Sequence, residues 1–132
     1  MLTEELALPH KVGDTFRVRL TVQERQSDTD PWLPMNLTDF DVVFGVGSAY
    51  GRGTAKKYRS VDDTPYVEIE SALDGTILID VPPAETRHWW EGTEVFSLYE
   101  VTLICSDTGD RMTVLEGPLV LRPEVVRDPH TG

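Results

Sequence analysis

The chain has little of several features that define common protein classes. Its single cysteine, Cys105, excludes an intramolecular disulfide, and no apolar run approaches the roughly 20 residues that a membrane-spanning helix needs. The first residues, MLTEELALPHKVGD, have neither the basic region nor the uninterrupted apolar region of a secretory signal. We therefore expect a soluble protein that is made in a cytoplasm and has no membrane partner. Because Cys105 lies in an alternating apolar segment, we also expect its thiol to be buried and inert.

Positive charge is scarce as well. The 132 residues include 12 Lys and Arg against 23 Asp and Glu, which gives a formal net charge of -11. A field of this sign repels the phosphate backbone of DNA or RNA unless a local basic patch overcomes it. We therefore expect no nucleic-acid partner.

The residue sets typical of metal, cofactor and catalytic sites are also missing from the sequence. The 3 histidines are scattered and only one cysteine could join them in a zinc site. Two acidic segments, 27–31 and 60–65, lack the spacing of an EF-hand loop and are typical of turns. No nucleophile elbow, phosphate-binding glycine loop or spaced carboxylate pair occurs. The sequence thus predicts a protein that is not an enzyme, with no catalytic residue, cofactor or metal.

The sequence has no long segment in which apolar residues recur with the helical period of about 3.6 residues. It has short segments in which apolar and polar residues alternate. In TFRVRLTVQE every second residue from Phe16 to Val22 is apolar, which is typical of a half-buried strand. Five further segments predict strands with these core-facing residues: Val42, Phe44, Val46, Val67, Ile69, Ile77, Ile79, Val81, Tyr99, Val101, Leu103, Cys105, Met112, Val114, Leu119 and Leu121. In LYEVTLIC, Leu98 and Ile104 face outward beside Glu100 and Thr102. The outer face of that strand is therefore not purely polar.

Turn residues separate these strands. Asp74-Gly75 predicts a tight hairpin. The apolar residues of MTVLEGPLVLRPEV change from even to odd positions across Gly117, which predicts a β-bulge there, and Pro118 excludes an ordinary central ladder position. Together the segments predict an all-β antiparallel sandwich of about six to seven strands.

The remaining organisation follows from length and helix signals. PPAETRHWWEG has prolines that can start a helix and a glycine that can end it, which predicts one short helical turn near residues 83–91. A chain of 132 residues is typical of one domain. We expect that domain at 12–126 with a loop insert near 48–64, an N-terminal arm at 1–11 and a C-terminal tail at 127–132.

Several motifs follow one another in a characteristic order. They are Gly13-Asp14-Thr15, Pro34-Met35-Asn36-Leu37-Thr38, Val42-Val43-Phe44, Tyr99-Glu100-Val101-Thr102-Leu103, Asp107-Thr108-Gly109 and Thr113-Val114-Leu115-Glu116-Gly117. In this order and spacing, over most of residues 10–126, the chain resembles the small Ig-like domains of tailed-phage and prophage structural proteins, including the N-terminal domain of phage baseplate upper proteins. The resemblance implies an Ig-like sandwich. Turn and bulge geometry explains the motif residues, so they indicate scaffold positions.

The resemblance also implies a function. It predicts a structural subunit of a tailed bacteriophage virion that acts by assembly, in the tail, the baseplate or a head-tail connector or adaptor. Its partners would be other phage virion proteins and further copies of itself, and it would be made in the host bacterial cytoplasm. Two alternatives stay open: a glycan- or host-surface-binding module that uses Trp89 and Trp90, and, ranked lower, a capsid decoration protein.

Two groups of residues are candidates for the subunit interface. Exposed Trp89 and Trp90 could stack on sugars, but neighbours on a helix lie about 100° apart, so the two rings do not form one flat platform. An end cap of the sandwich or a subunit contact is the preferred interpretation. The insert holds Arg52, Lys56, Lys57 and Arg59 with no acid among them; they are either a solvated loop or an electrostatic arm that docks on an acidic neighbour.

Overall fold

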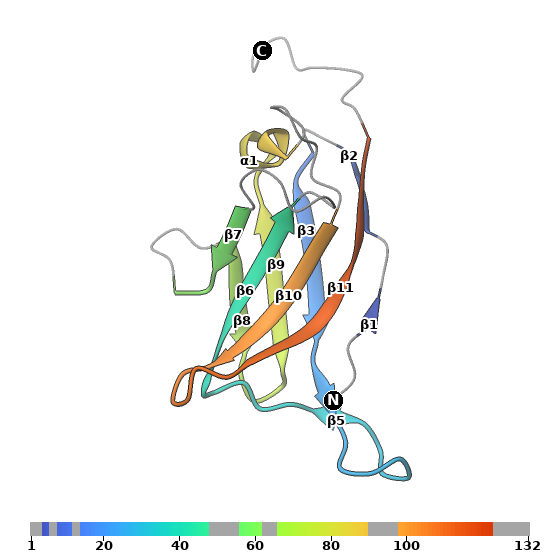
Figure 1. The fold of residues 1–132 in the computed structure, drawn as a ribbon, viewed down its shortest axis with the longest axis vertical. Coiled ribbons are helices and arrows are strands. Elements are labelled where there is room, and N and C mark those ends of the chain that lie inside the picture. Colours follow the sequence, from blue (N-terminus) through green and yellow to red (C-terminus); the bar gives the residue numbers. More distant parts are fainter. Residues whose placement is uncertain are drawn as a thin grey trace.

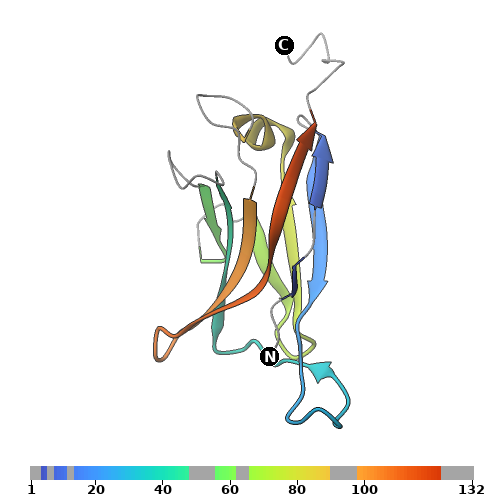
Figure 2. The same ribbon diagram turned by 45° about the vertical axis from the view of Figure 1, so that its right-hand side comes forward.

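Two β-sheets packed face to face form the molecule (Figures 1 and 2). The computed structural model describes residues 4–5, 8–11, 14–47, 56–61, 66–89 and 98–122. The first sheet has the order β11, β10, β6, β7, with β1 and β2 alongside β11, and the second has the order β3, β9, β8. This is the strand order of an Ig-like sandwich, so the predicted fold class is confirmed.

The strand bounds follow the alternating segments of the sequence. The first sheet is built from β1 (Glu4–Glu5), β2 (Leu8–Lys11), β6 (Phe40–Gly47), β7 (Lys56–Arg59), β10 (Leu98–Cys105) and β11 (Arg111–Arg122). The second is built from β3 (Phe16–Thr21), β8 (Val67–Ser71) and β9 (Thr76–Val81), and a small ribbon from β4 (Gln23–Glu24) and β5 (Leu33–Pro34). All pairs are antiparallel except those of β1 and β2 with β11, which are parallel.

The core lies between the two sheets and consists of the residues that alternation predicts. Phe44 of β6 and Phe16 of β3 stack across the sheets with ring centroids 5.6 Å apart. The other fully buried strand residues come from both layers: Val42, Val46, Val67, Ile77, Ile79, Val81, Val101 and Leu103. Cys105 differs from the prediction: it is only half-buried, because it is the last residue of β10 and lies at the end of the sandwich.

The predicted helical turn is α1 (Pro83–His88), which covers one end of the sandwich (Figure 1). Proline stands at its first positions, where a missing N–H costs nothing, as the sequence predicts. Thr86 is buried, and its hydroxyl donates to the carbonyl oxygens of Asp14 or Pro83, each at 3.1 Å. These contacts fix the helix against the start of β3.

The bulge lies at a different place from the one predicted. Val101 is opposite Leu115 but Thr102 is opposite Thr113, so Val114 is the extra residue, whereas Gly117 is in regular register with Tyr99. The apolar side chains change parity at Val114, because Leu115 is the first of the buried odd-numbered residues of β11. Pro118 needs no bulge either, since the β1 pairing ends at Glu116 and the β2 pairing begins at Leu119.

Two segments predicted to lie outside the sandwich contribute strands to it. Residues 4–5 and 8–11 of the predicted arm pair with β11 and cover its edge. Residues 56–59 of the predicted loop insert form β7 along β6. Neither segment has a clear apolar alternation. Their place is decided by main-chain pairing with a neighbour that lies far away in sequence.

Candidate functional site

Trp89 is part of the core and has no surface at which a ligand could bind. Its side chain is 0% exposed and meets the Phe16 ring edge to face, with centroids 5.3 Å apart. Phe44 is also within ring contact, at 6.1 Å. Trp89 therefore caps the end of the sandwich beneath α1, as the preferred interpretation of the sequence has it. Trp90, its predicted companion, lies outside the described residues.

A short hydrogen-bond chain holds this cap in place. The indole N–H of Trp89 donates to the Tyr58 hydroxyl at 2.9 Å, and that hydroxyl donates to Glu85 Oε1 at 2.8 Å. Burial of Tyr58 is the main reason that its pKa is raised above the ordinary value, and the nearby carboxylate of Glu85 adds to this shift. Tyr58 therefore stays protonated and links β7 to α1. The Tyr58 hydroxyl accepts one hydrogen bond from Trp89 and donates another to Glu85, so its role is structural.

Three of the four predicted basic residues lie together on β7. Lys57 and Arg59 pair with Gly45 and Val43 of β6 and so share the outer side of the sheet, whereas Lys56 pairs with Val46, on the opposite side. All three are exposed. The fourth, Arg52, lies outside the described residues. The basic group is thus held by the edge of a sheet and is not carried on a loop.

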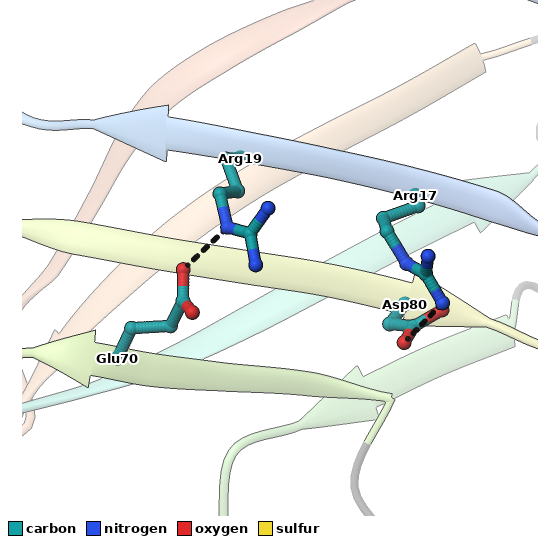
Figure 3. A network of polar contacts seen from close by, with 4 residues as sticks. All are labelled: Arg17, Arg19, Glu70 and Asp80. Atoms are coloured by element: carbon teal, nitrogen blue, oxygen red, sulfur yellow. Dashed lines mark hydrogen bonds and ion pairs between the residues drawn. The ribbon is translucent and has the colours of Figure 1, made fainter.

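The outer face of the second sheet carries paired charges. Arg17 of β3 contacts Asp80 of β9 at 3.3 Å, and Arg19 contacts Glu70 of β8 at 3.0 Å (Figure 3). All four side chains are substantially exposed, so each pair contributes at most about 1 kcal/mol. The two arginines of this face are therefore paired within the chain, whereas Glu68 on the same face is in no ion pair among the described residues.

The outer face of the first sheet is built differently. We call it the four-strand face and define it by two cross-strand rows. The strand registers align Lys57, Gly45, Glu100 and Glu116 in one row. They align Arg59, Val43, Thr102 and Thr113 in the next. Each row therefore crosses β7, β6, β10 and β11 in that order.

Short side chains fill the centre of the four-strand face. Val43 and Thr102 point away from the core, yet they are only 6% and 2% exposed. A Cβ at Gly45 would lie 3.6 Å from Cγ of Glu100, so Glu100 lies over that glycine. Leu98, opposite Gly47, adds an exposed apolar side chain to the same face. The centre of the four-strand face therefore has mostly short side chains and is partly apolar.

Within its two rows, the four-strand face separates charges of opposite sign, and Asp41 of β6 and Arg111 of β11 lie beyond these rows, beside Ile104. Lys57 and Arg59 lie on β7 at one edge, whereas Glu100 and Glu116 lie on β10 and β11. Within the described residues, no ion pair involves Lys57, Glu100 or Glu116. The acidic residues were not among the predicted interface residues. The available signal was the pair of apolar outward positions, Leu98 and Ile104, on β10.

Other kinds of site find no support in the part of the chain that the structure describes. No group of three or more His, Cys, Asp or Glu residues there could hold a metal ion. Among the same residues, no helix has the length and apolarity needed to cross a membrane. The thiol of Cys105 has its pKa lowered, chiefly by a hydrogen bond from the side chain of Thr108.

Comparison with protein-family models and with curated proteins finds no match to this chain.

Proposed function

We propose that this domain is a structural subunit of a tailed-phage virion that acts by binding other virion proteins, in the tail, the baseplate or a head-tail connector. The observation that carries an assembly role is the contrast between the two outer faces. One face pairs its two arginines with carboxylates of the same face, whereas the four-strand face has a partly apolar centre of short side chains and holds Lys57, Glu100 and Glu116 without an ion-pair partner among the described residues. Such a surface is suited to a protein contact, in which an apolar centre is surrounded by polar groups.

The phage context is supported by the motifs that carry the resemblance. Asp14-Thr15 directly precedes β3, and Asn36 forms a turn before β6 by accepting a hydrogen bond from the N–H of Thr38 at 3.0 Å. Gly109, with φ of 76°, closes the turn between β10 and β11. The motif residues thus occupy turns and strands of the scaffold. This placement agrees with a family whose members share a framework and differ in their contact surfaces.

The glycan-binding alternative receives no support from Trp89. A sugar ring stacks on the exposed face of an aromatic side chain, and Trp89 has none. We therefore do not favour the alternative over assembly.

The test is the protein content of purified particles. Virions or induced prophage particles from the strain that encodes this chain are purified by density gradient and quantified by mass spectrometry. We expect the chain at a fixed ratio to the major tail proteins, and a double Lys57→Gln, Arg59→Gln variant to be depleted. A double Arg17→Gln, Arg19→Gln variant is the matched control on the opposite face and should be incorporated normally. Particles that lack the wild-type chain overturn the proposal.

A further inference from the structure

We propose that the partner of the four-strand face is a second copy of this chain, bound about a two-fold axis that runs parallel to the strands between β6 and β10. The inference deepens the proposed function, since it names one partner of the same surface. The observation behind this proposal is the order of residues along the two rows, in which one end holds basic residues and the other holds a residue that can pair with them.

The geometry follows from the strand order. A two-fold axis parallel to the strands places β7 of one copy over β11 of the other, and β6 over β10. Each cross-strand row of one copy then faces the same row of the other copy, at the same position along the strands. Lys57 lies opposite Glu116 of the second copy, and Gly45 lies opposite its Glu100. The alternative axis, across the strands, would place β7 on β7 and bring like charges together, which is unfavourable.

Side-chain size is complementary under the same operation. Gly47 lies opposite Leu98 and Gly45 lies opposite Glu100, so glycines face larger residues across the axis, whereas Val43 and Thr102, which are alike in size, lie opposite each other. Val43, Gly45 and Gly47 follow one another on the outer side of β6, so the longer side chains at the centre of each face, Leu98 and Glu100, belong to β10. Two such faces can approach to the roughly 10 Å separation at which β-sheets pack.

Charge decides between a second copy and other occupants. An anionic polymer is repelled by a chain with a net charge of -11. A uniformly basic or acidic protein would satisfy either Lys57 or the two glutamates, but not both. A second copy presents charges of both signs, and each two-fold pair forms the Lys57 to Glu116 contact twice, whereas Glu100 lies opposite Gly45.

The size of the face sets the strength of the contact. Four strands spaced about 4.8 Å apart, with central strands of 8 residues, give a flat area of about 500 Å² per copy. The total of about 1,000 Å² is near the lower limit for a specific interface. We therefore expect a reversible, concentration-dependent dimer that would be strengthened by further contacts within a particle.

Sedimentation equilibrium of the full chain, from micromolar to millimolar concentration, tests the proposal. The wild type should dimerise, and Lys57→Glu or Glu116→Lys alone should raise the dissociation constant at least about tenfold, because each replaces two attractions by two repulsions. The double variant K57E/E116K should recover the wild-type value. Arg17→Glu, on the other outer face, is the matched control and should leave it unchanged. Far-UV circular dichroism shows whether each variant is folded.

A second measurement does not depend on variants. A zero-length carbodiimide cross-link between Lys57 and Glu116 is expected in mixtures of ¹⁵N-labelled and unlabelled chains, as a mixed-isotope peptide. Within one chain these residues are three strand spacings, or about 14 Å, apart, which such a link cannot span. A wild type that stays monomeric to millimolar concentration, or a double variant that does not recover, overturns the two-fold pair. Finding that monomer nonetheless incorporated into particles would leave the proposed function standing.

Discussion

At the scale of single residues, the tryptophan on the short helix is the clearest case. The sequence allows Trp89 to be either an end cap or a contact surface, and the structure makes it an end cap, packed on Phe16 and bonded to Tyr58. The sequence alone could not decide between these two roles, because a helix of six residues is too short for its apolar pattern to show which side faces the core. The partner of its N–H, Tyr58, comes from a segment predicted to be a loop.

Removal of the Tyr58 hydroxyl should destabilise the fold. In Tyr58→Phe the indole N–H of buried Trp89 loses its acceptor, so we expect the free energy of unfolding to fall by about 1 to 3 kcal/mol. Tyr66→Phe is the matched control, since Tyr66 packs on Tyr58 with ring centroids 5.5 Å apart but its hydroxyl has no hydrogen-bond partner among the described residues. Urea unfolding measures both. An equal loss in the two variants would contradict the role of the hydrogen bond.

The raised pKa of Tyr58 predicts a loss of stability in alkali. An unfolded tyrosine releases its proton near pH 10, whereas buried Tyr58 holds its proton to higher pH. The stabilisation is therefore complete below about pH 10 and decreases as the pH rises above it. Thermal unfolding from pH 9 to 12 should show a steeper fall in the midpoint for the wild type than for Tyr58→Phe. Parallel curves would contradict the assignment.

At the scale of elements, prediction succeeded where the pattern is local. Alternation located β3, β6, β8, β9 and β10, and the Asp-Gly pair located the turn between β8 and β9. It failed where pairing is remote. Strand β7 has one core residue, Tyr58, in four positions, and β1 and β2 are placed by parallel pairing with β11. The bulge lies at Val114 but was predicted at Gly117, because a glycine is visible in the local sequence whereas the strand register that determines the bulge is not.

Two turn glycines offer a matched test of this local code. Gly75 and Gly109 both have positive φ, at 69° and 76°. A Cβ at Gly75 would lie 2.6 Å from the Val22 carbonyl oxygen, whereas a Cβ at Gly109 meets nothing within 4 Å. We expect Gly109→Ala to cost about 1 kcal/mol through backbone strain, and Gly75→Ala about 2 to 4 kcal/mol because strain and overlap combine. Chemical denaturation measures the difference, and equal costs would show that the turn relaxes freely.

At the scale of the whole molecule, the two outer faces differ in a way that composition conceals. The net charge of -11 describes the chain as uniformly acidic, yet the fold puts Lys57 and Arg59 on one edge of the four-strand face and Glu100 and Glu116 nearer the other. The proposed virion role and the two-fold pair both depend on this separation. Of the six residues predicted for the interface, Lys57 and Arg59 lie on this face, and Lys56 lies on the opposite side of β7. Trp89 is in the core, and Arg52 and Trp90 lie outside the described residues.

The sequence by itself determined the class of fold, because apolar alternation with a period of two and turn residues act over a few neighbours. It also determined most of the core and the position of the helical turn. Only the tertiary structure decided which charged residues share an outer face, that the basic segment is a strand, and that the RHWW stretch contributes Trp89 to the interior. The physical reason is that these properties depend on registers between strands up to some hundred residues apart, and such registers follow from the packing of the whole sandwich.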